Sequence, residues 1–425
     1  MKERIRLTLL ALALLLALPR FAVGEGGPAA TPETGTQIAA PEGTSETAED
    51  EQEKPAESYS FFLRFDAPGH NGLPEKLLYD SLNQPESFDP YEQFSVQWAE
   101  DFPGHYLCVQ WNVIPVGVRL RQYDRNGVLL SEIDVPEVYD TILEVEEGTG
   151  RVTFLSDRQG MSVARIALYS KGILPESFSM DWLETPDHLD YLIISTHPDD
   201  DVIFMGAIAP IYGQERGYTG TVAYVTNPGR VRIHEALMGA WAMGVRHYPL
   251  FLGFRDINDN RVKEGATRFA PEIVTRAIVR LLRQYQPLVV FSQDLKGEYG
   301  HWQHLIVSAA VREACRLAAD EGYDPDSVSR FGAWEVKKCY LHLYPENPLV
   351  LDVNTPLASM GGRTAIEVAQ DAFLKHISQQ NGRHWVQTDR DAHPLSRFGM
   401  AYGTVDAGAD AFDNIDPALL IANSH

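Results

Sequence analysis

The pattern of hydrophobic and polar positions changes three times along the chain, which predicts four segments. An apolar run near the N-terminus is followed by a segment with hardly any apolar side chains. Short runs with a period of two come next, and the last part alternates strand-like runs with helical patterns. We place these segments at residues 1–24, 25–57, 58–175 and 176–425.

The third segment carries the period of two. Runs such as Phe94–Trp98 alternate apolar and polar residues, as strands with one buried face do. Residues 124–127 lie between two such runs, and their Asn-Gly pair favours a tight hairpin turn. This segment therefore predicts a small all-β sandwich domain. Trp98, Trp111 and Tyr123 could stack on a sugar ring, but aromatic residues in strands more often form the core, which we expect here.

The last segment predicts an α/β fold. Apolar runs at 191–196, 221–226, 248–252 and 288–292 predict strands, with helical patterns such as Pro271–Leu282 between them. This alternation predicts a Rossmann-like, mostly parallel sheet with helices on both faces. Past residue 380 no period is visible, and we expect loops.

Acidic and histidine side chains gather where the first strand of this fold should end. Pro198 follows His197, and Asp199, Asp200 and Asp201 come directly after it. Ligands of open α/β sheets bind outside the carboxyl ends of the strands, which favours a site. Three acids can equally cap the first turn of a helix, where the dipole favours negative charge. This stretch alone leaves both interpretations open.

Two more histidines follow the strand predicted at 288–292. After a glycine-containing loop, His301 and His304 stand three residues apart where the next helix should begin. With His197 and Asp200 they form a cluster at the strand ends of one sheet. Neutral imidazoles with a carboxylate are ligands that zinc accepts while leaving a position for water. The cluster predicts a metal site.

These motifs resemble the PIG-L family, the LmbE-like deacetylases, over about residues 187–379. The matching stretches are His197-Pro-Asp-Asp-Asp201 for the family's His-Pro-Asp-Asp-Glu, Arg232-Ile-His-Glu235 for its Arg-x-x-Glu, Asp256 after a strand, His301-Trp-Gln-His304 for its second histidine pair, and His376-Ile-Ser-Gln379 for a His-x-Ser-Gln stretch. The resemblance implies a zinc-dependent N-acetylglucosaminyl deacetylase.

The resemblance also implies roles for individual residues. His197, Asp200 and His304 would hold Zn²⁺, with Fe²⁺ as an alternative. Asp199 would be the general base for the metal-activated water, and His301 would steady the oxyanion and protonate the departing amine. An acetamide is a poor electrophile, and these residue types meet its three requirements: a Lewis acid, a nucleophile and a proton.

Three further positions would bind substrate by the same resemblance, namely Arg232, Asp256 and His376. Structural explanations stay open for two of them. Arg232 and Glu235 could form only a helix salt bridge, and His376 could make a structural hydrogen bond within a helical pattern at 364–379.

Two positions depart from the family pattern. Asp201 replaces the usual Glu, which shortens a supporting contact. Gln303 replaces an Asp that often precedes the last metal ligand, so tuning of the neighbouring imidazole by a charge should be weaker or absent.

Charge and the N-terminus predict the compartment and exclude one class of partner. The net charge of −23 argues against nucleic-acid binding, which requires basic patches. Lys2, Arg4 and Arg6 precede an apolar run at 7–18 that is shorter than a membrane span, as in a signal peptide. Residues 25–57 should form a disordered acidic linker. We therefore expect a secreted or extracytoplasmic protein, associated with the cell envelope through its N-terminal region if the signal segment stays uncleaved.

The predicted function is that of an exported zinc-dependent deacetylase, which hydrolyses the acetamide of an N-acetylated amino sugar in an N-acetylglucosamine-like glycan or glycoconjugate. A non-haem Fe(II) oxygenase also uses two histidines and one carboxylate, but normally on a β-barrel. The non-enzymatic alternative is a glycan-binding envelope protein with a decayed catalytic domain, and the intact cluster counts against it.

Overall fold

The computed structural model of the protein describes residues 54–70, 85–100, 102–156, 159–257 and 269–421. The predicted signal peptide at 1–24 and most of the predicted linker at 25–57 lie outside the described residues. All of the described residues belong to one compact unit of the chain. Within these ranges, no helix is long and apolar enough to cross a lipid bilayer.

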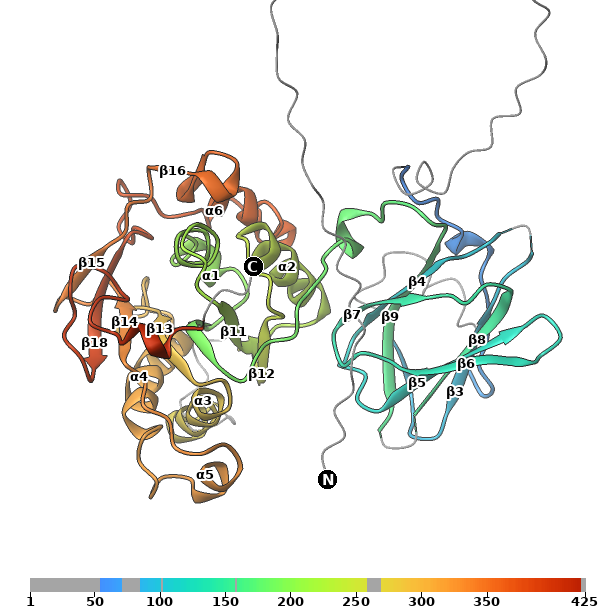
Figure 1. The fold of residues 1–425 in the computed structure, drawn as a ribbon, viewed down its shortest axis with the longest axis horizontal. Helices are drawn as coiled ribbons and strands as arrows, with labels where there is room; N and C mark the ends of the chain where they lie inside the picture. Colours follow the sequence, from blue (N-terminus) through green and yellow to red (C-terminus); the bar gives the residue numbers. More distant parts are fainter. Residues whose placement is uncertain (1–53, 71–84, 101, 157–158, 258–268, 422–425) are drawn as a thin grey trace, which may run out of the picture. The chain divides into compact units, whose positions relative to one another are not determined.

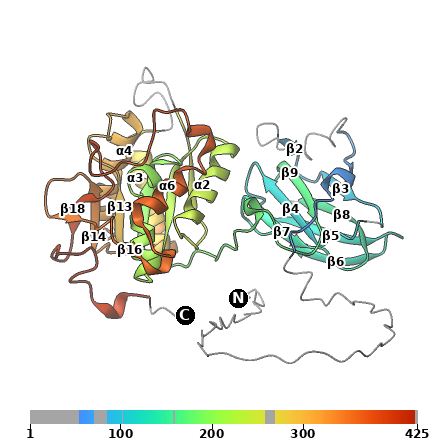
Figure 2. The same cartoon turned by 90° about the horizontal axis from the view of Figure 1, so that it is seen from above.

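Two antiparallel sheets come first along the described chain (Figure 2). The first has the order β1 (Arg64–Asp66), β3 (Gln93–Gln97), β8 (Thr149–Ser156), β5 (Val118–Asp124), β6 (Leu129–Asp134). The second has the order β2 (Glu86–Phe88), β9 (Met161–Tyr169), β4 (Tyr106–Trp111), β7 (Asp140–Glu144). Their inward-facing side chains share one apolar cluster, so the two sheets pack face to face.

The aromatic residues of these sheets behave mainly as core. Trp98 and Trp111 are buried, and the Trp111 ring meets Phe154 of the facing sheet edge-on at 5.6 Å. The predicted hairpin turn joins β5 and β6, where the Asp124 carboxylate accepts hydrogen bonds from two backbone N–H groups of the turn. The expected core role is confirmed for both tryptophans but not for Tyr123, which is only half-buried, lies outside this apolar cluster and has the Arg151 guanidinium over its ring. The limits of a separate domain at 58–175 stay a prediction.

A mixed seven-stranded sheet forms the centre of the following part. Its order is β12 (Leu250–Arg255), β11 (Gly220–Asn227), β10 (Leu189–Ser195), β13 (Pro287–Ser292), β14 (Lys338–His342), β18 (Arg397–Gly403), β15 (Pro348–Val350). The pairings from β12 to β14 are parallel, and the two that involve β18 are antiparallel. Strand β18 lies where the sequence predicted only loops, because its glycine-rich stretch has no clear period and its strand form depends on pairing with β14 and β15.

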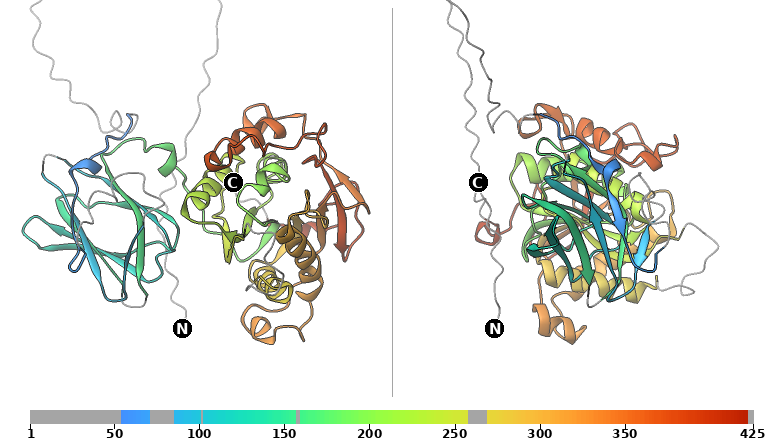
Figure 3. Two further views of the ribbon diagram at one scale, coloured as in Figure 1. Left: turned by 180° about the vertical axis from the view of Figure 1, so that it is seen from behind. Right: turned by 90° about the vertical axis from the view of Figure 1, so that its right-hand side faces the viewer.

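Helices cover both faces of this sheet (Figure 1). One face carries α1 (Asp200–Ile203), α2 (Arg230–Ala242) and α6 (Ala365–Phe373), and the other carries α3 (Pro271–Tyr285) and α4 (Trp302–Leu317), which lie side by side (Figure 3). Successive residues of β10 serve the two faces in turn: Ile193 packs into the first apolar cluster and Ile194 into the second. The α/β class predicted from the sequence is confirmed.

Short elements complete the described chain. They are α5 (Pro325–Phe331), β16 (Pro356–Leu357), β17 (Arg363–Thr364), the π-helix η3 (Ala209–Glu215), and the 3₁₀ turns η1 (Ser60–Phe62), η2 (Glu176–Phe178), η4 (Ala358–Met360), η5 (Ile377–Gln379) and η6 (Pro417–Leu419). The helix predicted at 364–379 begins with a capping box at Thr364 and Glu367 but ends at Phe373. His376 therefore lies in the turn before η5, not on a helix.

Residues of the first two sheets contact helix α2 within the same compact unit. The buried guanidinium of Arg230, the first residue of α2, forms an ion pair with Asp140 of β7. His234 Nδ1 lies 3.1 Å from the other oxygen of the same carboxylate. The backbone N–H of Tyr139 donates to the Tyr248 hydroxyl at 2.8 Å. The two contacts of Asp140 fix the start of α2, which also reaches the site described next.

Candidate metal centre and active site

The turn after β10 arranges its three acids for different contacts. The backbone N–H of His197 donates to Asp200 Oδ2 at 2.9 Å, which closes the turn. Asp199 precedes α1 with a φ of 120°, a conformation that L-residues rarely adopt, and its side chain makes no capping hydrogen bond. The capping interpretation therefore fails for Asp199, and its carboxylate is directed to other partners.

Three buried donor atoms converge beside this turn. His197 Nδ1 lies 3.0 Å from Asp200 Oδ2 and 3.0 Å from His304 Nε2, and His304 Nε2 lies 3.1 Å from Asp200 Oδ2. Ligands on a tetrahedral metal with bonds of about 2.0–2.1 Å stand about 3.3 Å apart, close to these separations. A ring nitrogen of His301 also lies within 4.8 Å of ring nitrogens of the other two histidines. The donor set fits a divalent metal ion.

The charges around these donors favour a cation. Burial opposes ionisation of Asp200, but His304 and His197 lower the pKa of its carboxyl well below the usual value. Burial also opposes protonation of His304, but Asp200 and Glu298 raise its pKa to about 10. Two carboxylates thus create a negative potential at the point where the nitrogen donors meet, and a metal ion would be held by the same potential.

Glu298 and His342 form a buried network behind His304 that sequence reasoning missed. Glu298 Oε2 lies 2.9 Å from His304 Nδ1, and Glu298 Oε1 lies 3.3 Å from His342 Nδ1. A carboxylate on the far nitrogen fixes the ring so that Nε2 faces the other donors. The available signal was an acid in the loop before His304, but its spacing of six residues matches no simple motif.

Gln303 contacts His197 through a neutral amide. Its Oε1 lies 3.1 Å from His197 Nε2, and its Nε2 donates to the Arg255 carbonyl at 3.1 Å. Asp256 Oδ1 lies 3.5 Å from the same His197 nitrogen. A carboxylate is therefore still present near His197, although it comes from the loop after β12.

Arg232 joins Asp199 to Asp256. Its Nη2 lies 2.9 Å from Asp199 Oδ2 and also donates to the Pro198 carbonyl, and its Nη1 lies 3.8 Å from Asp256 Oδ2. Glu235 instead accepts hydrogen bonds from the backbone and hydroxyl of Ser378, at 2.6 Å each. The alternative of a helix salt bridge between Arg232 and Glu235 is wrong.

The acidities of the remaining acids follow from burial. Burial raises the pKa of Asp199 well above the usual value, and the positive charge of Arg232 only partly opposes this. Asp201 accepts hydrogen bonds from the Tyr224 hydroxyl at 2.8 Å and from the Asp199 backbone at 3.2 Å, and burial raises its pKa to about 7. Asp201 thus holds the turn, which is the supporting position the sequence predicted.

Two further histidines are kept neutral. Burial and the nearby His304 and His197 lower the pKa of the half-buried His301 to about 4. His376 is fully buried, and neither of its ring nitrogens has a hydrogen-bond partner within the described ranges. Burial, with Arg232 nearby, lowers its pKa to about 3. His376 therefore shares the site's electrostatic environment, and its role as a substrate contact stays a prediction.

The part of the chain that carries this site matches a known protein family. Residues 192–315, which carry the converging donors, Arg232 and Asp256, match the family described as PIG-L, GlcNAc-PI de-N-acetylase. Over these residues the chain is similar to the PIG-L family.

Individual proteins and solved structures are also similar to parts of this chain. A 1D-myo-inositol 2-acetamido-2-deoxy-alpha-D-glucopyranoside deacetylase of Catenulispora acidiphila is 23% identical over 210 residues, which are 42% of this chain and 64% of that relative. The N,N'-diacetylchitobiose deacetylase of Pyrococcus horikoshii is 19% identical over 45% of this chain and 70% of its own, with a TM-score of 0.36. A family 32 CBM from C. perfringens NanJ is 12% identical over 26% of this chain and 96% of its own, with a TM-score of 0.22.

The PIG-L match includes most of the residues singled out in the sequence. His197, Asp199, Asp200, Arg232, Asp256, His301 and His304 lie inside the match, and His376 lies beyond its end. The structure brings the three predicted metal ligands into contact distance and places Asp199, Arg232 and Asp256 around them. The individual roles in binding and catalysis stay predictions.

Proposed function

We propose that the protein is an exported, zinc-dependent deacetylase that hydrolyses the acetamide of an N-acetylated amino sugar in a glycan or glycoconjugate. The observation that carries this proposal is the convergence of His197, Asp200 and His304 beside Asp199 within the residues that match the PIG-L family. The names of the sequence relatives support the reaction class, because these proteins are named as deacetylases of an acetamido sugar.

The choice of zinc rests on the donor set. His197, Asp200 and His304 would hold the ion through two imidazole nitrogens and one carboxylate oxygen, which suits Zn²⁺ and also Fe²⁺. A bound divalent metal would polarise the acetamide carbonyl and lower the pKa of a water molecule.

Asp199 would act as the general base. Arg232 occupies its Oδ2, so the proton of the attacking water would pass to Oδ1. The pKa of the Asp199 carboxyl is raised toward neutral pH. A general base is most effective when its pKa lies near the working pH, because it must accept a proton and later release it. The fixed guanidinium also prevents the carboxylate from turning away.

His301 would interact with the oxyanion and with the departing amine. As a neutral imidazole it can donate a hydrogen bond to the developing oxyanion. After taking up a proton from solvent, its low pKa would make it a strong acid for the departing amine, while Asp199 would return the proton of the attacking water to solvent. Arg232 and Asp256 would bind hydroxyl groups of the sugar, because both lie at the partly exposed edge of the cluster.

The N-terminal sequence supports export. Lys2, Arg4 and Arg6 before the apolar run at 7–18 have the order of a signal peptide, followed by the acidic stretch 25–57. We therefore infer a secreted or envelope-associated protein in which a β-sandwich domain at 58–175 precedes a deacetylase domain at 176–425.

Release of free amine tests this proposal. The metal-replete full chain should release amine from N-acetylglucosamine, from its oligomers or from peptidoglycan fragments, and His304→Ala should serve as the blank. Metal analysis should find about one zinc ion per chain, and activity should not require oxygen. Release at the level of the blank on every substrate would favour a glycan-binding protein with a decayed catalytic domain.

A further inference from the structure

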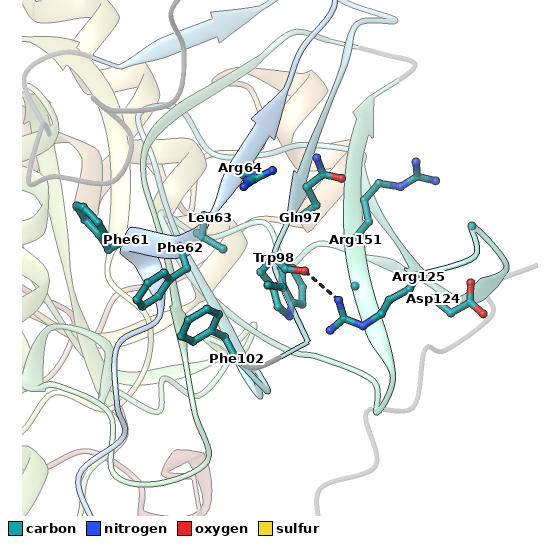
Figure 4. A pocket seen from close by; sticks show the side chains of 13 residues that line it. Phe61, Phe62, Leu63, Arg64, Gln97, Trp98, Phe102, Asp124, Arg125 and Arg151 are labelled. Atoms are coloured by element: carbon teal, nitrogen blue, oxygen red, sulfur yellow. Dashed lines mark hydrogen bonds between the residues drawn. The ribbon is translucent and has the colours of Figure 1, made fainter.

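A pocket lies outside residues 192–315, on the first antiparallel sheet. It has a volume of about 630 Å³ and is lined by residues of η1, the ends of β3 and β5, and the start of β8. Among its lining side chains, Figure 4 shows three phenylalanines and three arginines, Phe61, Phe62, Phe102, Arg64, Arg125 and Arg151. The proposed deacetylation uses none of them.

The phenylalanines form an exposed aromatic surface. Phe61 is 73% exposed and Phe62 is 45% exposed, and both line the pocket. The Phe62 ring stacks on Phe102 at 3.8 Å with an interplanar angle of 11°, which holds it in place. Exposed aromatic groups beside polar residues are typical of ligand-binding grooves.

Strand register brings two arginines onto the same outer face. Arg64 of β1 is directly opposite Gln97 of β3, and Gln97 is directly opposite Arg151 of β8. Side chains of directly opposite residues share one face of a sheet, so these three form a row with the neutral glutamine between the two charges. The Arg151 guanidinium lies over the Tyr123 ring at 4.6 Å, which orients it.

The positive charge of this row is not neutralised locally. Within the described ranges, neither Arg64 nor Arg151 forms an ion pair. The third arginine, Arg125, has Glu100 at 3.9 Å, but the Glu100 side chain is 85% exposed. The Asp124 carboxylate is already bonded to turn amides. Three guanidinium groups thus face one pocket in a chain with a net charge of −23.

We propose that this pocket binds an acidic saccharide that carries carboxylate groups, such as a short run of uronic acids. The apolar face of a sugar ring would pack on Phe61 and Phe62, and Arg64 and Arg151 would bind the carboxylates through paired N–H donors. A neutral sugar would leave these guanidinium groups without an anionic partner. The protein would thereby bind a charged glycan at a site separate from the metal centre.

Binding of tetragalacturonic acid to the full-length protein tests this proposal. Isothermal titration should detect binding of the acid, and its fully methyl-esterified form should bind at least about tenfold more weakly, because a lost charged hydrogen bond costs about 1.5–3 kcal/mol. The affinity for the acid should also fall as NaCl increases.

Matched variants locate the site. Arg64→Gln and Arg151→Gln should each weaken binding of the acid by about tenfold or more. Arg119→Gln removes an arginine of β5 that pairs with Glu132 outside the pocket, and it should leave the affinity unchanged. Phe61→Ala should weaken binding without lowering the melting temperature, since this side chain is exposed.

Three results would overturn the proposal. They are equal binding of the acid and its ester, full binding by both arginine variants when their melting temperatures are unchanged, and binding of phosphatidylglycerol vesicles without binding of the tetrasaccharide. Each readout is independent of amine release, so the proposed deacetylation and the saccharide site can fail separately.

Discussion

At the scale of single residues, Asp199 combines an unfavourable backbone conformation with a buried carboxylate. Its backbone has a φ of 120°, its carboxylate is buried, and Arg232 is its ion-pair partner. Backbone strain of about 1–3 kcal/mol persists where the surrounding structure holds it and is concentrated at functional sites. The hydrogen bonds of the turn to Asp200 and Asp201 supply that support.

Asp199→Asn should reduce kcat for amine release by about 10²–10⁴-fold, the usual contribution of a general base. Asparagine tolerates positive φ, so the turn should persist. The zinc content should stay near wild type, because Asp199 is not one of the three converging donors, whereas His304→Ala should lose both metal and activity. Metal analysis beside the amine assay checks this, and full activity of Asp199→Asn would show that the base is wrongly assigned.

Glu298→Gln should weaken metal binding by about 10–100-fold, the usual effect of removing a carboxylate that orients a ligating histidine. The amide keeps an acceptor for His304 Nδ1 but removes the charge. Competition with a chromophoric chelator measures the affinity. Glu313→Gln, at an exposed ion pair of α4, is the control, and equal affinities of the two variants would exclude a role for Glu298.

His376 should make the protein less stable in acid. Its folded pKa of about 3 lies below the ordinary value of 6.5 for a histidine, so between these values the unfolded chain binds a proton that the folded protein does not. Stability should therefore fall as the pH decreases from 6.5, by up to about 1.4 kcal/mol per pH unit. Urea unfolding between pH 7 and pH 5 should show a shallower slope for His376→Gln, and an identical slope would contradict the buried neutral state.

At the scale of elements, the strands and the first half of the site could be predicted because their signals are local. One apolar run ends just before His197-Pro198, and another ends before the loop that leads to His301, so both motifs were predicted at strand ends. Parallel pairing of β10 with β13 brings these two strand ends together. The contact of Glu298 with His304 and His342 could not be predicted, since it depends on a loop with left-handed backbone at Glu298. Strand β18 was missed for a similar reason, because only its neighbours define it.

The packing of α2 against the turn before η5 gives an element-scale prediction. Alanine is favoured over glycine inside a helix by about 0.8–1.0 kcal/mol, but a Cβ at Gly239 would lie 2.5 Å from Nε2 of the buried His376. Gly239→Ala should therefore lower the melting temperature. In a His376→Ala background the same change should raise it, and a decrease in both backgrounds would mean that another contact is responsible.

At the scale of the whole molecule, the candidate metal centre and the proposed saccharide pocket lie on different sheets. The converging donors and Asp199 lie at strand ends of the mixed sheet, whereas the arginine row lies across the outer face of an antiparallel sheet. Charge sums could not reveal the arginine row, because the net charge of −23 conceals a local positive group. Only the strand register places Arg64 and Arg151 in the same row.

Asp140→Ala should reduce the free energy of unfolding by about 3–5 kcal/mol, because it removes the carboxylate that pairs with the buried Arg230. Chemical denaturation of the full chain measures this. Asp134→Ala, at an exposed position of β6, should change the stability by no more than about 0.5 kcal/mol. Similar effects of the two changes would mean that the Arg230 ion pair adds little.

The first turn of α2 connects strand β7 to the candidate active site. Arg230 and Arg232 are two residues apart and point in different directions, one to Asp140 of β7 and the other to Asp199. A displacement of β7 would therefore be transmitted through half a helical turn to the carboxylate proposed as the base. If a saccharide on the first sheet changed the affinity of the candidate metal centre for a transition-state analogue by this route, thermodynamic reciprocity would require the analogue to change saccharide affinity by the same factor.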